Sequence, residues 1–261
     1  MAGKCKHKTK KLVLGLAFIL LIVIIAGCAW YLSDYYHADA EVSDYLQGSS
    51  DLTITEIDDG LFIDGSGTED ALIFYPGAKV EYTACVPLMC QLAENGVDVF
   101  LIKMPCNLAI LGVNKADDII DEYNYAHWYI GGHSLGGAMA ASYAAEHDDE
   151  DTKLTGLILL AAYPTKNLVS SDLHVLTVYG SEDGVLNMTK IADGRELMPK
   201  DYTELVIEGG NHAQFGCYGE QSGDGTATIS ASEQRKQTVN AILALVEEVG
   251  KSFVLSPLSN S

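Results

Sequence analysis

Short apolar runs alternate with helix-like segments along most of this chain. Apolar runs bounded by turn residues are typical of buried strands, and they occur at 52–57, 61–63, 71–75, 97–102, 127–130, 154–162, 174–179 and 202–207. Helical composition or spacing is found within 34–47, at 82–94, 116–123, 188–198 and 233–249, and directly after Ser134. Strands that alternate with helices predict a mostly parallel sheet covered on both faces, with binding sites beyond the carboxyl ends of its strands.

The N-terminal segment has a different pattern. Residues 12–32 contain no charged side chain and are long enough to cross a bilayer core, which requires about 20 helical residues. The preceding lysines belong on the cytoplasmic side, which places the following domain outside the cytoplasm. The chain is therefore divided into a basic cytoplasmic tail (1–11), a transmembrane anchor or signal segment (12–32), a linker with a short helix (33–50), the sheet domain (51–250) and a C-terminal tail (251–261).

Two alternatives to an uncleaved single-pass anchor remain open. Residues 25–28 (IAGC) resemble a bacterial lipobox, in which Cys28 would be lipidated and become the mature N-terminus. Cleavage followed by release is the other alternative. The apolar run continues past Cys28 through Trp30 and Tyr31, which suit an interfacial aromatic belt and favour the uncleaved anchor in the cell membrane.

The charge of the chain is strongly acidic and unevenly placed. The formal net charge is −20, with 36 acidic and 16 basic residues. All acidic residues lie at or after Asp34 and five lysines precede it, so the remaining chain carries 11 basic against 36 acidic residues. Such a surface repels nucleic acid and anionic lipid head groups, and nucleic acid is excluded as a partner. Solubility explains this acidity, with selection of cationic substrates as the alternative.

The cysteines give no metal or cofactor signal. Neither a CxxC pair nor a His/Cys ligand spacing occurs, so we expect no metal and no cofactor. Cys85, Cys90, Cys106 and Cys217 lie in the predicted domain and are expected to be buried free thiols, although their pairing stays open because four cysteines permit three connectivities.

The clearest chemical signal is the pattern G-x-S-x-G at residues 132–136. An apolar strand runs there directly into a helix rich in small residues. Glycines two before and two after Ser134 leave room for a tight strand-to-helix turn that exposes the serine hydroxyl. We therefore interpret Ser134 as a nucleophile rather than as part of a purely structural turn.

A serine nucleophile needs a base and an acid that orients the base. In folds with this turn the acid and then the histidine follow the serine along the chain. His212 follows a predicted strand, whereas His174 begins one and would lie at the wrong end of the sheet. The acid is expected after the strand 174–179, where Asp183 is preferred to Glu182 because a short carboxylate before a glycine can reach the imidazole.

Two backbone amides are expected to stabilise the oxyanion of the tetrahedral intermediate. One belongs to Leu135, which follows the nucleophile. The second is expected from the loop after the strand 71–75, where the spacing nominates Ala78, with Lys79 as the neighbouring possibility.

Several stretches together resemble the α/β-hydrolase superfamily, in particular a membrane-anchored bacterial branch related to dienelactone hydrolases. The stretches are PGAKVEY (76–82), KMPCNLAILG (103–112), GGHSLGGAMA (131–140), YGSEDG (179–184) and EGGNHAQFGCYG (208–219). The resemblance covers roughly residues 50–250 and implies an α/β-hydrolase fold with an eight-stranded sheet, a Ser134–Asp183–His212 triad and no metal. The chain differs from dienelactone hydrolases proper in having serine, not cysteine, as the nucleophile.

Access to the site is expected to be open. Relatives often carry a cap domain before the strand that bears the acid, but only residues 165–173 are left for it here. Lys103 could contact an acidic substrate group, with a surface ion pair as the alternative. Glu81 is a second candidate for substrate binding, with helix capping as the alternative.

These observations predict a membrane-tethered serine hydrolase that acts outside the cytoplasm on a small carboxylic ester or lactone through an acyl-enzyme. An acyltransferase or a peptidase with the same triad is an alternative. A non-catalytic binding protein with this fold is another, although a complete set of triad residues favours an enzyme.

Overall fold

An eight-stranded sheet is the centre of the structure, a computed structural model that describes residues 2–147 and 154–255. The strand order is β1-β2-β4-β3-β5-β6-β7-β8. β2 pairs antiparallel with β1 and β4, and all other neighbours are parallel, so the prediction of a mostly parallel eight-stranded sheet is confirmed. The strands are β1 Thr53–Ile57, β2 Gly60–Asp64, β3 Asp70–Tyr75, β4 Val97–Ile102, β5 His127–His133, β6 Leu154–Leu160, β7 His174–Gly180 and β8 Tyr202–Ile207.

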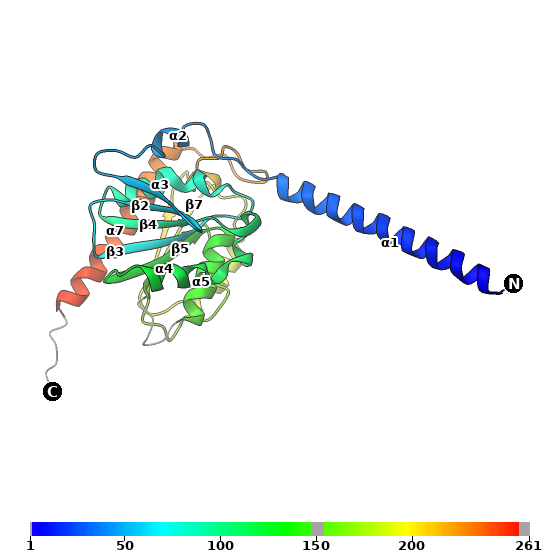
Figure 1. Ribbon diagram of the computed structural model, residues 1–261. Helices are drawn as coiled ribbons and strands as arrows, with labels where there is room; N and C mark the ends of the chain where they lie inside the picture. The colour runs from blue at the N-terminus through cyan, green and yellow to red at the C-terminus, as the bar shows by residue number, and fades with distance from the viewer. Residues whose placement is uncertain (1, 148–153, 256–261) are drawn as a thin grey trace. The chain divides into compact units, whose positions relative to one another are not determined.

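Helices cover both faces of this sheet (Figure 1). Successive residues of a strand point to opposite faces, so Val99 and Leu101 pack with α3 and α7, while Phe100 and Ile102 share a cluster with α4 and α5. The helices of the domain are α2 Val42–Tyr45, α3 Val86–Ala93, α4 Ala116–Glu122, α5 Leu135–Glu146, α6 Met188–Arg195 and α7 Ala231–Leu255. Short 3-10 turns lie at Tyr82–Cys85, Pro105–Asn107, Ala109–Leu111, Val113–Lys115 and Ala213–Phe215.

The chain divides into two units, Met1–Tyr35 and Tyr36–Ser261. The first contains helix α1 (Ala2–Ser33). Within it, Lys10–Ser33 has 24 residues and, in the described parts of the chain, is the one helix long and apolar enough to cross a membrane. At about 1.5 Å per residue this length exceeds the roughly 30 Å of a hydrocarbon core. A signal sequence near the N-terminus passes the same test of length and composition.

Several boundaries differ from the sequence prediction, four of them for a visible reason. β5 continues three residues further than expected, to His133, because it pairs in register with β6. β6 ends at Leu160 rather than at residue 162, since Ala161 adopts a positive φ of 47° that breaks the strand. α7 extends to Leu255 and so includes half of the expected C-terminal tail, whose residues 256–261 lie outside the described structure. The 3-10 turn Tyr82–Cys85 replaces the start of the helix expected at 82–94.

Residues 36–42 pack on the domain rather than forming a free linker. The amide of Tyr36 donates to the carbonyl of Lys79 at 2.7 Å, and the amide of Glu81 donates to the carbonyl of Tyr36 at 2.8 Å. The amide of Asp39 donates to the carbonyl of Cys217 at 2.8 Å. We call residues 36–42 the entry strap, because they connect the loop after β3 with the loop after β8.

The sheet carries no cap domain between β6 and β7, as the short connection in the sequence led us to expect. No helix or strand lies between β6 and β7, although all of residues 161–173 are described. The chain therefore passes from β6, the neighbour of β5, through residues 161–173 to β7 and the loop that contains Asp183. The prediction of an α/β fold without a large cap is confirmed.

Three of the four domain cysteines are buried free thiols as expected. Burial raises the pKa of Cys85, Cys90 and Cys217 to about 12, which keeps these thiols protonated and unreactive at neutral pH. Cys106 is exposed, contrary to the prediction, because it lies in the short 3-10 turn after β4, where it has a positive φ of 55°, and not in a buried element.

The hydroxyl of Tyr75, at the end of β3, fixes the loop after β4. It donates to the carbonyl of Val113 at 2.7 Å and accepts from the amide of Ala116 at 3.1 Å, and the side chain is fully buried. Tyr75→Phe removes both bonds and leaves two backbone groups without partners, so we expect a loss of about 1–3 kcal/mol in the free energy of unfolding.

Denaturant unfolding followed by circular dichroism measures this loss. Tyr123→Phe is the matched control, since the Tyr123 ring packs against Phe62 and Phe100 and its hydroxyl makes no hydrogen bond in the described structure. The control is expected to change stability by less than about 0.5 kcal/mol. Equal stability of the two variants would contradict the role assigned to the Tyr75 hydroxyl.

Candidate active site

Ser134 alone joins strand β5 to helix α5. Its amide donates to the carbonyl of Leu160 at 2.9 Å and continues the sheet, while its carbonyl accepts from the amide of Ala138 at 3.1 Å and begins the helix. Both bonds require φ 53° and ψ −121°, a conformation that costs a residue with a side chain about 1–3 kcal/mol. Such strain in a non-glycine residue is typical of functional sites.

Glycines make this turn sterically possible. A Cβ on Gly132 would lie 2.5 Å from the carbonyl carbon of Gly136. A Cβ on Gly136 would lie 2.0 Å from the carbonyl oxygen of Tyr75 and 2.4 Å from that of Pro76. The G-x-S-x-G pattern therefore brings the start of α5 into backbone contact with the end of β3 and the loop that follows it.

His212 and Asp183 meet below the surface. His212 Nδ1 lies 2.8 Å from Asp183 Oδ2, and their side chains are only 1% and 0% exposed. The other carboxylate oxygen, Oδ1, accepts from the amides of Val185 and Leu186 at 2.9 and 2.8 Å. Because a carboxylate can only accept, Nδ1 carries the hydrogen and Nε2 is left with a lone pair.

Of the two carboxylates considered for this loop, only Asp183 faces the histidine. The Glu182 side chain instead accepts from the hydroxyl of its neighbour Ser181 at 3.2 Å and is exposed. His174, the alternative base, pairs with Asp201 at the amino end of β7, at the opposite edge of the sheet from Ser134.

A cleft of about 240 Å³ brings Ser134 and His212 together. His212 Nε2 is buried and has no hydrogen-bond partner in the described chain, so its lone pair is available, but the Ser134 hydroxyl does not bond to it in this structure. In unliganded enzymes such contacts are often long and tighten when substrate binds. The cleft is lined by Ser134, Leu135, Ala138, Ala161, Ala162, Tyr163, Val185, Leu186, Asn187 and His212.

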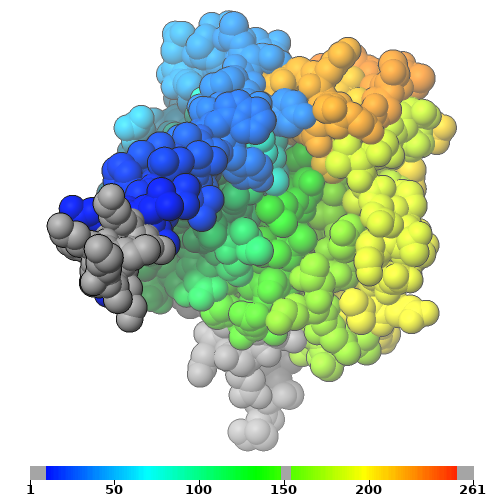
Figure 2. Space-filling view, turned by 90° about the vertical axis from the view of Figure 1, so that its right-hand side faces the viewer, coloured from blue at the N-terminus to red at the C-terminus, as the bar shows by residue number. Residues whose placement is uncertain are grey.

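The loops around this cleft follow β5, β6, β7 and β8, and these parallel strands end at one edge of the sheet. Figure 2 shows parts of the chain coloured green, yellow and orange side by side on one face, so segments distant in sequence meet there. The edge formed by the carboxyl ends of the parallel strands is where open α/β sheets bind ligands.

The amides expected to form an oxyanion hole belong to the first turn of α5 and to the loop after β3, whose backbones are in contact at Gly136 and Pro76. Leu135 is the first residue of α5, and an amide in the first turn has no acceptor within the helix. The Lys79 amide is engaged, since it donates to the carbonyl of Asn107 at 2.8 Å. Ala78 therefore remains the candidate from this loop, although it is not among the residues that line the cleft.

Lys103 and Glu81, the two candidates for substrate contact, lie outside the residues that line the cleft. Lys103 Nζ is 5.8 Å from the centre of the Tyr82 ring. Glu81 accepts from the amide of Ala38 at 3.1 Å and from the hydroxyl of Thr83 at 3.0 Å. Glu81 thus holds the entry strap. In the described residues no group of three or more His, Cys, Asp or Glu side chains is arranged to hold a metal ion.

His133, which sequence analysis did not single out, contacts both the ring and the backbone carbonyl of His212. Its ring is 97% buried and lies 4.6 Å from the His212 ring. His133 Nε2 is 3.1 Å from the carbonyl oxygen of His212, and a carbonyl can only accept, so Nε2 carries the hydrogen. Burial, and then the neighbouring His212, lower the pKa of His133 well below its ordinary value. The one feature of the sequence that could have indicated a role for His133 is its position directly before Ser134, at the end of the strand.

The depressed pKa of His133 predicts a specific loss of stability in acid. Below pH 6.5 the unfolded chain takes up a proton on His133 that the folded protein cannot accept, so stability falls with pH until the folded pKa is reached. From pH 7 to 5.5 this amounts to about 1.2 kcal/mol for one histidine. His133→Gln retains a side-chain donor and does not titrate.

We therefore expect the free energy of unfolding of His133→Gln to fall less than that of the wild type between pH 7 and 5.5, by about 1 kcal/mol. Urea unfolding at both pH values measures the difference. The contribution of His133 is isolated because the wild type and the variant have all other titrating groups in common. Parallel pH dependence of the two proteins would contradict a buried neutral His133.

Comparisons with known proteins agree with this geometry. A sequence profile described as the alpha/beta hydrolase family matches residues 71–236, which include Ser134, Asp183 and His212. Comparison with curated proteins gave no significant match.

Among solved structures, Est1E from Butyrivibrio proteoclasticus is similar with a TM-score of 0.51 and 14% identity, over 76% of this chain and 100% of that one. The mouse alpha/beta hydrolase domain-containing protein 10 has a TM-score of 0.51 and 12% identity, over 77% and 100%. A CIB-like hydrolase predicted for Thermoplasma acidophilum has a TM-score of 0.53 and 15% identity, over 73% and 97%.

At these identities the solved structures show a shared fold alone. The family profile spans more than half of the chain. The strained serine between β5 and α5, the uncapped parallel sheet and this match lead to one conclusion. The chain belongs to the alpha/beta hydrolase family.

Proposed function

We propose that the protein is a membrane-tethered serine hydrolase that cleaves a small carboxylic ester or lactone outside the cytoplasm. The observation that carries this proposal is the pairing of a strained Ser134 with a buried His212–Asp183 hydrogen bond at one cleft. The membership of the chain in a family of hydrolases supports it. The dienelactone-like branch suggested by the sequence motifs is part of the same proposal.

The first chemical step forms an acyl-enzyme. His212 Nε2 takes the proton of the Ser134 hydroxyl while the serine oxygen bonds to the carbonyl carbon of the substrate. The carbonyl oxygen becomes an oxyanion, which the Leu135 and Ala78 amides stabilise, each contributing about 3 kcal/mol. Asp183 stabilises the imidazolium through Nδ1. Collapse of the intermediate breaks the ester bond, and His212 returns its proton to the leaving alcohol.

The second step releases the acid. Water loses a proton to His212 Nε2 and attacks the acyl carbon, and a second tetrahedral intermediate collapses to the carboxylic acid as Ser134 recovers its proton. In a lactone the leaving alcohol stays attached to the acyl group, so a single hydroxy acid is released after the same two steps.

The lining of the cleft supports an uncharged, small acyl group. The apolar walls are Ala138, Ala161, Ala162, Val185 and Leu186. In the part of the chain that the structure describes, His212 and Tyr163 are the only titratable side chains that line the cleft. A volume of about 240 Å³ is below the usual range of roughly 300–1,000 Å³ for drug-sized ligands. Among the described residues no cation lines the cleft, so we propose a neutral acyl group rather than an acidic one that Lys103 would bind.

The apolar helix within α1 supports the tether. Lys10–Ser33 is long enough to span a bilayer, and the lysines before it favour a cytoplasmic N-terminus. Such an arrangement brings the enzyme to substrates outside the cell or at its surface.

Ser134→Ala tests the nucleophile. The wild type is expected to be labelled by a fluorophosphonate probe and to hydrolyse short-chain p-nitrophenyl esters, whereas the variant should lose labelling and at least about 10³-fold in kcat. Gel fluorescence of the labelled protein and initial rates measure both. Ser222→Ala is the control, since Ser222 is exposed and lies outside the cleft.

Full labelling of Ser134→Ala would overturn the proposal. A labelled wild type that transfers acyl groups to added alcohols faster than to water would indicate the acyltransferase, and one that cleaves peptides in preference to esters would indicate the peptidase. A wild type that takes up no label and cleaves nothing would indicate the non-catalytic binding protein.

Cys28→Ser separates the uncleaved anchor from the lipoprotein. With an uncleaved anchor, the wild type and the variant both stay in the membrane fraction after carbonate extraction, and their intact masses include residues 1–27. Mass spectrometry of the purified chains measures this. A wild type that begins at a lipid-modified Cys28, with a variant that accumulates as a longer precursor, would show the lipoprotein instead.

A further inference from the structure

One carboxylate outside the triad bonds to the backbone of both loops that carry the acid and the base. Asp224 Oδ1 accepts from the amide of Gly184 at 3.1 Å and from the amide of His212 at 3.2 Å. Its Oδ2 accepts from the amide of Ala213 at 2.9 Å. Gly184 directly follows Asp183, so a single side chain joins the acid loop to the base itself.

The backbone around Asp224 also packs directly on the acid loop. A Cβ on Gly225 would lie 1.8 Å from the carbonyl oxygen of Glu182. A Cβ on Gly184 would lie 2.7 Å from both the carbonyl oxygen of Gly223 and the amide of Gly225. Only glycine fits at Gly184 and Gly225, so these positions allow the two backbones to approach closely enough for the Asp224 side chain to reach the amides.

Other bonds hold the opposite flank of each catalytic residue. The amide of Glu182, just before Asp183, donates to the carbonyl of Gly210 at 2.8 Å. The amide of Asn211, just before His212, donates to Gln234 Oε1 at 2.9 Å. Asp224 supplies backbone bonds on the far side, at Gly184 and Ala213, and it is the side chain that joins the two loops there.

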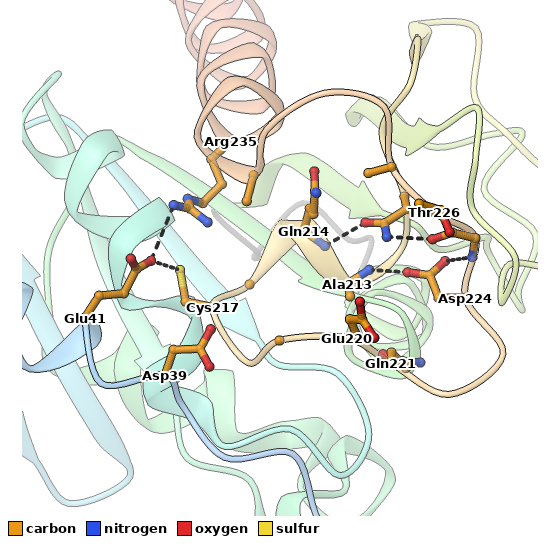
Figure 3. A pocket seen from close by; sticks show the side chains of 16 residues that line it. Asp39, Glu41, Ala213, Gln214, Cys217, Glu220, Gln221, Asp224, Thr226 and Arg235 are labelled. Atoms are coloured by element: carbon orange, nitrogen blue, oxygen red, sulfur yellow. Dashed lines mark hydrogen bonds and ion pairs between the residues drawn. The ribbon is translucent and has the colours of Figure 1, made fainter.

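Figure 3 shows Asp224 and the Ala213 amide joined by a hydrogen bond in the wall of a pocket. This pocket has a volume of about 410 Å³ and is lined by Asn211, Ala213 and Asp224, whereas His212, between the first two, lines the Ser134 cleft. The histidine loop therefore separates the two cavities, and Asp224 holds it from the side opposite the substrate.

We propose that Asp224 is a positioning residue that sets the distance between Asp183 and His212, an inference that rests on the proposed hydrolase function. Hydrogen bonds from amides to a carboxylate are stronger than those to neutral acceptors. Asp224 touches neither the substrate nor the reacting atoms. It acts by holding the backbone at Gly184, His212 and Ala213, so that the imidazole meets both its acid and the serine.

The kinetic test compares Asp224→Ala and Asp224→Asn with the wild type, each as the full chain in detergent micelles. Loss of the carboxylate should displace the base, and small displacements can lower rates about 100-fold. We expect Asp224→Ala to reduce kcat about 10- to 100-fold with less than about 3-fold change in KM. Rates are divided by the number of fluorophosphonate-reactive sites, so that a fraction of unfolded protein does not count as a lower kcat.

Asp224→Asn is expected to recover part of this loss. Its amide oxygen can still accept from the amides of Gly184 and His212, but its NH₂ group faces the amide of Ala213, so we expect a 3- to 10-fold reduction in kcat. If Asp224→Ala fails to fold, the kcat of Asp224→Asn alone tests the positioning role of Asp224. Glu220→Gln is the matched control, since Glu220 lines the same pocket and is exposed, and its kcat should stay within about 2-fold.

A spectroscopic readout separates this inference from the proposed function. The Nδ1 proton shared with a carboxylate resonates far downfield in proton NMR, and its loss in His212→Gln assigns it. We expect that signal in the wild type and in Glu220→Gln, and expect it broadened or shifted in Asp224→Ala and Asp224→Asn while the thermal unfolding transition remains cooperative.

Failure of the proposed function and failure of the inference then differ. A wild type without esterase activity or serine labelling would remove the proposed function, and the NMR signal would still test whether Asp224 positions the pair. An active wild type whose Asp224 variants keep both kcat and the downfield signal would overturn the inference. Equal loss of kcat in Glu220→Gln would also overturn it, because the effect would then belong to the charge of the pocket.

Discussion

The backbone at Ser134 is the constraint on which the rest of the site depends. One residue has to end β5 and begin α5, and it does so with φ 53° and ψ −121°. The turn is possible only because Gly132 and Gly136 have no side chains, and Gly136 in turn lies against the carbonyls of Tyr75 and Pro76. The same close approach therefore places the start of the loop after β3 against the first turn of α5, which begins at Leu135. The strain of about 1–3 kcal/mol is carried by the surrounding sheet, whose neighbouring strand accepts the Ser134 amide.

Local signals in the sequence were sufficient for the sheet and for the three central side chains. Apolar runs bounded by turn residues predicted all eight strands, and the order of the sheet then decides that residues after β5, β7 and β8 meet at one edge. Chain order and side-chain length were enough to prefer Asp183 to Glu182, and the 2.8 Å contact with His212 agrees with that choice. Their catalytic roles belong to the proposed function.

What the sequence did not predict depends on contacts between distant segments. His133 is adjacent to Ser134 in sequence, but its bond is to the carbonyl of His212, 79 positions away. Asp224 lies in a loop of small and polar residues that reads as solvent-exposed, and its role is apparent only when two other loops surround it. Glu81 was expected near the substrate and instead accepts from Ala38, because the entry strap packs there. No periodicity or motif encodes such contacts.

The entry strap links the loops of the site through backbone hydrogen bonds. Tyr36 bonds to the carbonyl of Lys79, whose own amide bonds to Asn107, so the loops after β3 and β4 are joined at one point. The hydroxyl of Tyr36 also accepts from the amide of Ser222 at 3.1 Å, in the loop that carries Asp224. Loops at the end of a sheet have no strand neighbours to hold them, so these bonds restrict the position of the Ala78 amide relative to His212. Because the unit boundary falls between Tyr35 and Tyr36, the first residues of the second unit are already part of the framework of the cleft.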